Sequence, residues 1–537
     1  MFKEKPAKVR KAVSLGAFSK AHQVDRLSNY REYFTLARSM GRSLKFLAGP
    51  TNSGKTYHAL NELAKGESGL YLAPLRLLAL EGQEELEKRQ VEASFVTGEE
   101  RDIREGARFV ASTIEMANLQ KAVDCAVIDE IQLMADPARG WAWAQALIGV
   151  PARSVIMTGS EDAIPLVEAM ANYLKEPLRI ETFQRFNDLE VHETPVSLDD
   201  VRSGSAIIAF TRRDVLNIKQ YLQNERRQKV SVIYGNLSPQ VRREEARRFR
   251  SGETEILVAT DAIAMGLNLP IQSVLFYVTQ KFNGQEIVPL TDAEIRQIAG
   301  RAGRYGFHEY GFVGSLDSWG DLRRIRAALK NPSTSIAGPV GIIPSPSYVG
   351  ALAKALNTRR LATVLKEFQR NMTFDSDLLR PGVTDDMVML ASLADEFPLD
   401  LDTRYMMSCA PVDPGESVVM EYWMAYLRSI SQGVATRAAV PQGVLELDSK
   451  DATHLYLAET LVKCMTLYAW LSYRDEILFP DISQCNELRL RLNQYIETGL
   501  KQKGMKVRCK LCNAALPPLH EYGICDRCFR SHRRRRR

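Results

Sequence analysis

The chain has 537 residues, of which 45% are hydrophobic and 25% are charged. This balance is ordinary for a soluble globular protein, and it excludes wholesale disorder, a collagen-like fibre and a small disulfide scaffold. At roughly 100–200 residues per domain, the length predicts three or four domains. No run approaches the ~20 apolar residues that a membrane span needs. No apolar segment follows the basic N-terminus, so we expect neither secretion nor a membrane partner.

The formal net charge of +6 is unevenly distributed along the chain. Residues 1–45 hold eleven basic and three acidic residues, and residues 501–537 hold twelve basic and two acidic residues, so the two ends carry +8 and +10. The 455 residues between them therefore carry −12. Basic ends on an acidic body suit a polyanion such as nucleic acid, and the simpler alternative is a pair of solvated termini.

Hydrophobic spacing predicts one helix over residues 22–42 as the first element. Strand-like runs then alternate with helical stretches, which predicts a parallel sheet covered by helices on both faces. The alternation restarts after residue 195, so we expect two consecutive α/β units. The predicted strands are 44–48, 69–73, 126–128 and 154–158 in the first unit, and 206–210, 230–234, 256–259 and 273–277 in the second.

The remaining chain is predicted to be mainly helical. Residues 331–347 hold four of the 23 prolines, which indicates a linker or an ordered extended crossing. From residue 348 to 502, amphipathic runs rich in Leu, Ala and Met predict helices. The predicted divisions are a basic N-terminal segment at 1–43, two α/β domains at 44–194 and 195–335, a helical region at 336–502 and a cysteine-rich module at 503–537.

Residues 49–56, GPTNSGKT, match the phosphate-binding pattern G-x-x-x-x-G-K-[ST] between a predicted strand and a predicted helix. Glycines at both ends of this phosphate loop let backbone N–H groups wrap around a phosphate. Lys55 can reach the β- and γ-phosphates, and the Thr56 hydroxyl can ligate Mg²⁺. The predicted nucleotide-binding residues of the loop are Gly49, Thr51, Asn52, Ser53, Gly54, Lys55 and Thr56.

The acidic pair Asp129-Glu130 directly follows the predicted strand 126–128. Asp129 would hold Mg²⁺, directly or through a water, and Glu130 would polarise the attacking water. The alternative is a strand end with two solvated acids. The phosphate loop upstream favours the catalytic interpretation.

Residues 297–304, QIAGRAGR, place Arg301 and Arg304 on the same side of a predicted helix. Their small neighbours let the backbone approach a ligand, and arginine suits the charge on a transferring phosphoryl group. The alternative is a pair of surface arginines on a basic helix, to which Arg296 would belong. The functional interpretation requires the second domain to bring these arginines to a nucleotide held by the first.

These motifs, in this order, resemble those of superfamily-two helicases. Residues 259–269, ATDAIAMGLNL, resemble motif V of that superfamily, and from it we expect Asp261 to contribute to nucleotide binding. Finer details resemble the Suv-three family, the ATP-dependent RNA helicases of the mitochondrial degradosome and their bacterial relatives. The segments that carry this resemblance are GPTNSGKTYHAL, APLRLLA, TGEE, DEIQLM, VIYGNL and, at 469–474, AWLSYR. The resemblance covers about residues 40–500.

The resemblance implies two RecA-like domains with ATP in the cleft between them, single-stranded nucleic acid crossing both, and 3′-to-5′ movement. It implies that Gln297, Arg301 and Arg304 complete the ATP site from the second domain, and that an exoribonuclease is a partner. Four threonines are expected near the nucleic-acid backbone, although a threonine at a strand end is commonly structural: Thr97, Thr113, Thr211 and Thr260.

The chain departs from the superfamily pattern in two places. Thr158-Gly159-Ser160 stands where many members have Ser-Ala-Thr, so we assign no residue that couples hydrolysis to movement. No aromatic residue and glutamine upstream of the phosphate loop form a recognisable adenine clamp, so we expect loose base selectivity.

The C-terminal cysteines follow the pattern Cys509-x₂-Cys512-x₁₂-Cys525-x₂-Cys528, which suits tetrahedral Zn²⁺. Four thiolates leave no open position, so the zinc would be structural. One alternative is two disulfides, which are disfavoured in a cytosolic ATPase. The other is a redox pair, but no thioredoxin-like βαβ unit surrounds the cysteines. His520 is a candidate substitute ligand. Arginines 533–537 follow the cysteine motif. They suit contacts to the phosphates of nucleic acid that do not depend on the base sequence. The other cysteines, expected to be buried thiols, are Cys125, Cys409, Cys464 and Cys485.

The fold class that we expect is α/β, with two tandem RecA-like parallel-sheet domains, a helical region and a small C-terminal zinc ribbon. The expected function is that of an ATP-dependent RNA helicase in RNA turnover, with ATP, Mg²⁺ and Zn²⁺ as cofactors. The alternatives are a DNA helicase or translocase, and a nucleic-acid-binding scaffold whose ATPase is a switch. We expect a bacterial cytoplasmic location, with mitochondria as the alternative, because residues 1–24 are Lys-rich rather than Arg- and Ser-rich.

Overall fold

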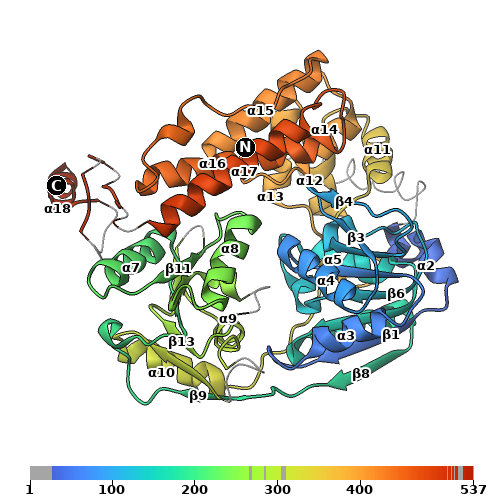
Figure 1. Ribbon diagram of the computed structural model, residues 1–537. Coiled ribbons are helices and arrows are strands. Elements are labelled where there is room, and N and C mark those ends of the chain that lie inside the picture. Colours follow the sequence, from blue (N-terminus) through green and yellow to red (C-terminus); the bar gives the residue numbers. More distant parts are fainter. Residues whose placement is uncertain are drawn as a thin grey trace, which may run out of the picture.

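The computed structural model describes residues 27–264, 269–283, 286–303, 310–502, 504, 506–509, 511–512, 514–517 and 524–535. Two parallel sheets lie side by side, and a helical region arches over both of them (Figure 1). Among the described helices, none combines the length and the apolarity needed to cross a bilayer.

The first sheet has eight strands within the described residues, in the order β4-β3-β5-β2-β6-β7-β1-β8, and only β4 runs antiparallel to its neighbour. Helices α3 and α4 pack on one face, and α5 and α6 pack on the other. Because both faces are covered, a central strand such as β2 is apolar and buried throughout. The elements are β1 (Ser43–Ala48), α3 (Lys55–Leu63), β2 (Gly69–Ala73), α4 (Arg76–Lys88), β3 (Ala93–Val96), β4 (Arg101–Asp102), β5 (Phe109–Thr113), β6 (Val123–Ile128), α5 (Gly140–Gly149), β7 (Ala152–Gly159), α6 (Ile164–Leu174) and β8 (Leu178–Thr182).

The second sheet has six strands within the described residues, all parallel, in the order β11-β12-β10-β13-β16-β9. Two parallel sheets confirm the predicted fold class. The chain changes sheets between β8 and β9, so the second sheet begins before the boundary predicted at residues 194 and 195. The elements are β9 (Asp188–Val191), β10 (Ser205–Ile208), α7 (Arg212–Asn224), β11 (Val230–Ile233), α8 (Pro239–Arg250), β12 (Ile256–Ala259), β13 (Ser273–Phe276), a hairpin of β14 (Gln280–Phe282) and β15 (Ile287–Pro289), α9 (Asp292–Ala299), β16 (Tyr310–Ser315) and α10 (Trp319–Lys330).

The single helix predicted at 22–42 is wrong for the described part of that range. The chain instead forms a 3-10 helix, η1 (Leu27–Tyr33), and a short helix, α2 (Thr35–Ser39). Phe34 between them leaves the helical region of backbone space, with φ −94° and ψ 64°. Its buried ring packs against Gly149 at the end of α5. Tertiary packing of one aromatic side chain therefore interrupts a pattern that looks helical in the sequence.

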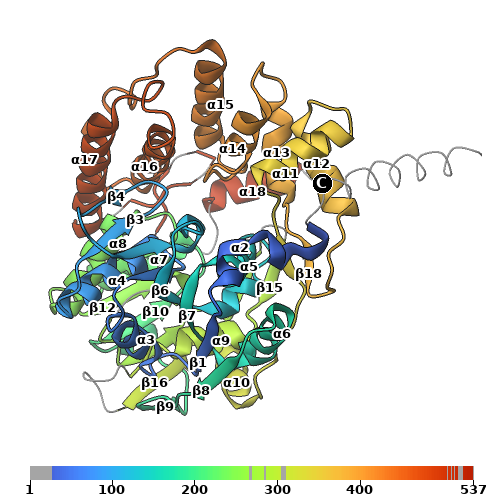
Figure 2. The same cartoon turned by 90° about the vertical axis from the view of Figure 1, so that its right-hand side faces the viewer.

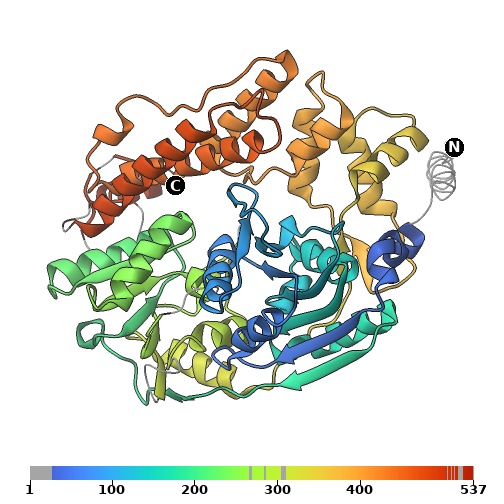
Figure 3. The ribbon, with the colours of Figure 1, turned by 45° about the vertical axis from the view of Figure 1, so that its right-hand side comes forward.

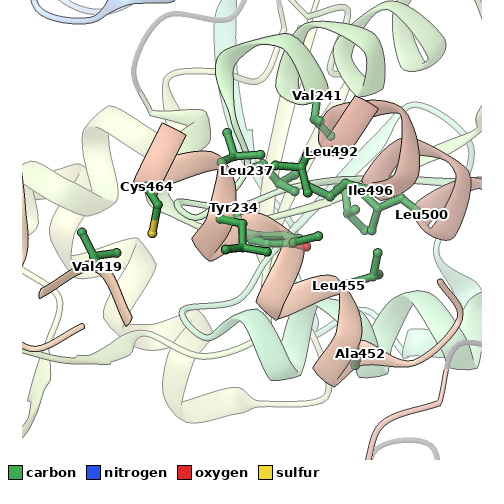
Figure 4. Close-up of a cluster of buried hydrophobic side chains, with 14 of the residues drawn as sticks. Tyr234, Leu237, Val241, Val419, Ala452, Leu455, Cys464, Leu492, Ile496 and Leu500 are labelled. Carbon is green, nitrogen blue, oxygen red and sulfur yellow. The ribbon is translucent and has the colours of Figure 1, made fainter. Parts of the chain in front are cut away.

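The helical region covers the same side of both sheets (Figures 2 and 3). Its first half packs on the first domain, where strand β17 shares a core with α5. Its second half shares a core with the second domain, as Figure 4 shows for Val241 of α8 beside Leu492 of α17. The small sheet of β17 and β18 was not predicted. The elements are β17 (Val340–Ile342), α11 (Pro346–Ala355), α12 (Leu361–Asn371), β18 (Leu379–Pro381), α13 (Asp385–Ala394), α14 (Leu401–Ser408), α15 (Ser417–Gln432), α16 (Ala452–Ser472) and α17 (Ile482–Lys501).

The C-terminal module is attached to the start of α16. Lys506 pairs with Asp451 as an isolated parallel bridge, and the Ala452 N–H donates to the Lys506 carbonyl at 3.0 Å. Val507 and Leu516 are buried in the core that α16 shares with the second domain. Helix α18 (Asp526–Arg535) ends the described chain at the edge of the molecule, on the side of the second domain (Figure 1).

Candidate nucleotide-binding and nucleic-acid-binding sites

The phosphate loop joins the buried strand β1 to helix α3, in the context that its motif requires. Gly54, at the N-cap of α3, has φ +80°, a conformation that L side chains rarely adopt. Within the described residues, no side chain forms a capping hydrogen bond at the N-terminus of α3, so its first N–H groups have no side-chain acceptor there. Unsatisfied N–H groups at a helix N-terminus favour an anion such as phosphate.

Lys55 folds back over the phosphate loop. Its Nζ donates hydrogen bonds to the carbonyl oxygens of Gly49 at 2.7 Å and Pro50 at 2.6 Å. Burial lowers the pKa of Lys55, and the charges of Glu130 and Asp129 oppose this shift. The charge of Arg301 lowers the pKa further. Lys55 therefore lies within electrostatic reach of both the acidic pair and an arginine of the second domain.

Asp129 lies buried at the end of β6 and contacts the phosphate loop. The Thr56 hydroxyl donates to its Oδ1 at 3.4 Å, and the Tyr71 hydroxyl donates to its Oδ2 at 2.8 Å. Thr158 on β7 also donates to Oδ1. Burial and the neighbouring charge of Glu130 raise the pKa of Asp129. A hydroxyl and a carboxylate side by side are oxygen ligands of the kind that Mg²⁺ prefers, so Thr56 and Asp129 fit the predicted metal site.

Glu130 is held in an unusual backbone conformation, with φ +54°. Non-glycine residues in this region are uncommon and cluster at functional sites. Its N–H donates to Asp129 Oδ1 at 3.1 Å, and the Gln132 amide donates to its carboxylate. The oxygen of the same Gln132 amide accepts from the Ser160 N–H at 3.3 Å. Thr158 and Ser160, to which the sequence assigned no role, thus connect the end of β7 to the acidic pair.

Arg301 follows α9 of the second domain and donates to the Ala264 carbonyl. Burial lowers its pKa, and the charges of Glu130, Glu81 and Asp129 oppose the shift. The first domain therefore supplies acids close enough to act on this guanidinium. Its Nε is buried without a hydrogen-bond partner within the described residues. Gln297 lies on α9, just before Arg301 in the chain, and Arg304 lies outside the described residues.

The phosphate loop touches the arginine segment directly. A Cβ built on Gly300 would lie 2.9 Å from the Thr51 Cβ, so these two residues are in close contact. The Asn52 amide donates to the Gly303 carbonyl at 2.9 Å. The structure thus brings the phosphate loop together with the segment around Arg301, and the remaining predicted nucleotide-binding residue of the second domain is Asp261. That residue is exposed at the start of the short helix η6 (Asp261–Ile263), 4.0 Å from Lys281 Nζ.

The four threonines expected near nucleic acid lie at the carboxyl ends of parallel strands. Thr113 ends β5, and Thr97 follows β3, where its hydroxyl accepts from the Glu100 N–H at 3.0 Å. Thr211 accepts from the Asp214 N–H at 3.0 Å, and Thr260 accepts from the Ala262 N–H at 3.2 Å. Three of the hydroxyls thus have local capping partners, which supports the structural alternative as well. Contact with nucleic acid stays a prediction for all four.

Helices α16 and α17 contact this edge of both sheets. Trp470, in the AWLSYR segment, approaches Gly98 so closely that a Cβ there would lie 3.2 Å from its ring. Arg489 of α17 lies 3.9 Å from Glu99 and 3.8 Å from Glu100 of the same loop. On the second domain, Arg212 pairs with Glu459 of α16 at 2.8 Å. The helical region is therefore fixed above the predicted nucleic-acid path at both domains.

The four C-terminal cysteines gather in one place. Their sulfur atoms all lie within 4.8 Å of one another, and the Cys525 N–H donates to Cys509 Sγ at 3.2 Å. Cys512 Sγ and Cys525 Sγ are 3.5 Å apart, well beyond the ~2.05 Å of a disulfide bond. This donor set suits tetrahedral zinc. The alternative ligand His520 lies outside the described residues. Of the other four cysteines, Cys409 is exposed, so its predicted burial is wrong.

Comparisons with known families identify the same regions. The DEXQ-box helicase domain of Suv3 matches residues 31–183, the helicase conserved C-terminal domain matches 179–306, and the ATP-dependent RNA helicase SUV3 C-terminal domain matches 455–502. Among solved structures, that of S. cerevisiae Dbp5 bound to RNA and ADP BeF3 is similar with a TM-score of 0.42 and 16% identity, over 60% of this chain and 92% of that one.

Curated relatives are similar over most of the chain. The DExH-box ATP-dependent RNA helicase DExH16, mitochondrial, of Arabidopsis thaliana is 35% identical over 87% of this chain and 82% of its own length. The ATP-dependent RNA helicase SUV3, mitochondrial, of Oryza sativa subsp. japonica is 32% identical over 88% and 83%. Two other relatives are longer, and this chain spans 62% and 65% of their lengths. Identity of this level over this length shows that the chain belongs to the SUV3 family of ATP-dependent RNA helicases.

Proposed function

We propose that the chain hydrolyses ATP in the cleft between its two sheets and uses the hydrolysis to move 3′-to-5′ along single-stranded RNA and to unwind duplexes. The observation that carries this proposal is the direct contact between the phosphate loop of the first domain and the segment around Arg301 of the second, where the Asn52 amide donates to the Gly303 carbonyl at 2.9 Å. The relatives named above as RNA helicases support RNA as the substrate.

Each residue of the site has a proposed role. Lys55 and the N–H groups of the phosphate loop hold the β- and γ-phosphates. Thr56 and Asp129 would hold Mg²⁺, which neutralises phosphate charge when it is bound. Glu130 polarises the attacking water, and Arg301 stabilises charge on the transferring phosphoryl group. Gln297, Arg304 and Asp261 are proposed to contribute to the same site.

Two assays separate this function from its alternatives. ATP hydrolysis is measured with RNA and DNA strands of equal length and sequence, because backbone contacts distinguish the sugars only where a 2′-OH is read. We expect stronger stimulation by RNA, and preferential stimulation by DNA would favour the DNA translocase. Displacement of a labelled strand from duplexes with 3′ or 5′ overhangs is then compared. We expect unwinding only from the 3′ overhang, and ATPase without unwinding of either duplex would favour the scaffold.

We also propose that Cys509, Cys512, Cys525 and Cys528 hold one structural zinc ion. The clustering of their sulfur atoms within 4.8 Å supports this assignment. Elemental analysis of the purified protein is expected to give one zinc per chain, and the Cys512→Ser, Cys528→Ser double variant is expected to give none. Absence of zinc together with loss of four free thiols would favour the disulfide alternative.

The remaining proposals concern location and partners. The relatives reported above are mitochondrial by name, which supports the mitochondrial alternative and not the bacterial cytoplasm that the sequence suggested. Imaging of a tagged copy in the source organism tests the location. An exoribonuclease partner rests on the family resemblance alone, and co-purification under native conditions tests it.

A further inference from the structure

The connection between the two sheets, residues 183–187, runs along the phosphate loop. Figure 1 shows the chain crossing here from β8 of the first sheet to β9 of the second. The Phe183 N–H donates to the Ala48 carbonyl at 2.7 Å, and the Phe186 N–H donates to the Asn52 carbonyl at 3.3 Å. A Cβ on Gly49 would lie only 2.4 Å from the Phe183 carbonyl oxygen. Gly49 is therefore needed for packing against this connection as well as for any phosphate.

Arg185, in the middle of this connection, binds backbone on both sides of the cleft. Its NH1 donates to the carbonyl oxygens of Thr51 at 3.3 Å and Gly300 at 2.8 Å, and its NH2 donates to the Ala302 carbonyl. Its Nε donates to the Asn187 carbonyl at 2.8 Å. A planar guanidinium with several fixed donors can span acceptors in this way, whereas an ammonium group cannot.

The surroundings of Arg185 are unusual for an arginine. Among the described residues it forms no ion pair within 4.0 Å, and the acceptors given above are all backbone carbonyls. Burial lowers its pKa to about 10, against the opposing charge of Asp188. Removing a guanidinium from water without giving it a carboxylate partner costs free energy. For Arg185, hydrogen bonds to backbone carbonyls offset this cost. Such a residue is better explained by the backbone that it fixes than by a gain in stability.

The backbone that Arg185 fixes is that of the predicted catalytic arginine. Gly300 and Ala302 flank Arg301 in the sequence, so two of the four acceptors lie on either side of it. A third, Thr51, belongs to the phosphate loop. Asn187 adds a hydrogen bond from its amide to the Gly303 carbonyl at 2.9 Å. One side chain thus links the loop that would hold the phosphates to the segment that carries Arg301.

We propose that Arg185 is a positioning residue for ATP hydrolysis, which holds the backbone around Arg301 against the phosphate loop so that its guanidinium meets the transferring phosphoryl group. This inference rests on the proposed role of Arg301. Because catalysis needs reacting groups in near-attack geometry, a displacement of about 1 Å can lower the rate by ~10²-fold. We expect ATP binding to depend mainly on Lys55 and the N–H groups of the phosphate loop. Substitution of Arg185 should therefore change ATP binding much less than the rate of hydrolysis.

The test compares kcat and KM for ATP, at saturating RNA, in Arg185→Lys and Arg185→Gln. We expect kcat to fall by ~30- to 100-fold in both variants while KM for ATP changes by less than ~3-fold. Arg179→Ala is the matched control, since Arg179 lies on β8 with a side chain that is 76% exposed and is expected to leave both constants unchanged. Unchanged kcat in both Arg185 variants, or a rise in KM alone, would overturn the proposal.

Arg301→Ala, measured in parallel, separates this inference from the proposed function. If Arg301→Ala hydrolyses ATP normally, the role of Arg301 has failed, and the positioning role fails with it. If Arg301→Ala is impaired and the Arg185 variants are not, only the positioning role is wrong. Residues that act as a unit are not additive, so Arg185→Gln is expected to cause no further loss in the Arg301→Ala background. Thermal unfolding of Arg185→Lys within ~2 °C of the parent shows that a fall in kcat is not a loss of fold.

Discussion

Lys55 begins α3 and Glu130 follows β6, and the two residues are expected to act at different steps of the reaction. Lys55→Ala removes a direct contact to the phosphates, so ATP binding and hydrolysis should weaken together. Glu130→Gln keeps the shape of the side chain but cannot polarise water, so binding should persist while turnover falls by ~10²-fold or more. Affinity for a fluorescent ATP analogue and steady-state hydrolysis measure the two effects. Equal hydrolysis by Glu130→Gln and the parent would contradict the assignment.

Arg301 is expected to be essential for hydrolysis although it lies far from the phosphate loop in the sequence. An arginine that stabilises the transferring phosphoryl group can contribute ~10³-fold or more to the rate, so Arg301→Ala should lose about that factor. Arg296→Ala is the matched control, because Arg296 lies on α9, five residues before Arg301, and donates instead to the Ala328 carbonyl at 2.8 Å. Equal losses in both variants would indicate damage to α9 rather than a role for one guanidinium.

Lys219 is a buried charge, and its protonation gives stability a measurable pH dependence. Burial lowers its pKa to about 8, against the opposing charge of Glu245. Since the pKa in the unfolded chain is about 10.4, the unfolded state binds more protons than the folded state between these values. Stability from this residue should therefore rise with pH from about 8 to about 10. Urea unfolding at pH 7.5 and 9.5 should show a smaller rise in Lys219→Met than in the exposed-site control Lys229→Met.

The sequence predicts those candidate site residues that sit in local motifs. The phosphate loop, Asp129-Glu130 and Arg301 each belong to a short pattern whose chemistry depends on neighbours a few residues away. Tyr71 and Arg185 belong to no such pattern. Tyr71 contacts Asp129 from 58 residues away, and Arg185 contacts Gly300 from 115 residues away. Only the fold brings such pairs together, so spacing along the chain could not identify them.

At the scale of elements, each of the eight predicted strands overlaps a strand of the structure, because buried parallel strands are continuous apolar runs. The missed strands include β8 and β9, which lie at the edges of their sheets. Edge strands bury less apolar surface, and β9 reads Asp-Leu-Glu-Val, so its composition gives no strong signal. This omission explains why the predicted second domain begins after β9, although β9 belongs to the second sheet.

Helix α16 is joined to the second domain by a buried ionic group. Glu459 is 1% exposed. Its carboxylate accepts three hydrogen bonds from the Arg212 guanidinium and one from the Tyr234 hydroxyl at 2.6 Å. Glu459→Gln leaves the Arg212 charge without its partner, and breaking a buried pair from one side costs about 3 kcal/mol. We expect the unfolding temperature to fall by several degrees.

Two comparisons check this explanation for Glu459. Glu421→Gln on α15 changes an exposed carboxylate and should leave the unfolding temperature unchanged. The double variant Arg212→Gln, Glu459→Gln should be less destabilised than the sum of the two single variants, since it leaves no unpaired charge. Strict additivity would show that Glu459 acts through packing alone.

At the scale of the whole molecule, the acidic body and the basic C-terminal end are held together by specific contacts. Lys506 Nζ lies 2.8 Å from an Asp448 carboxylate oxygen, and Arg508 pairs with Asp451 at the N-cap of α16. Arg212, next to Thr211, donates to the Ala452 carbonyl at 3.1 Å. The module is therefore attached within a few residues of the predicted nucleic-acid path over the second domain. From this placement we expect the module to bind the same strand as the helicase core.

The basic tail, arginines 533–537, is expected to add salt-dependent affinity for RNA without contributing to the ATP site. Each phosphate neutralised on a single strand contributes about −0.7 to the slope of log affinity against log salt. Replacing the five arginines at 533–537 by glutamine should therefore flatten this slope by up to about 3.5 and weaken RNA binding most at low salt. Basal ATP hydrolysis and zinc content should not change. Truncation after residue 504 removes ten basic residues and should flatten the slope at least as much. It also removes the buried Val507 and Leu516, so the glutamine variant isolates the charge of the five arginines. An unchanged slope in the glutamine variant would mean that the tail does not contact phosphates, and the basic end would then be the solvated terminus that the charge pattern left as the alternative.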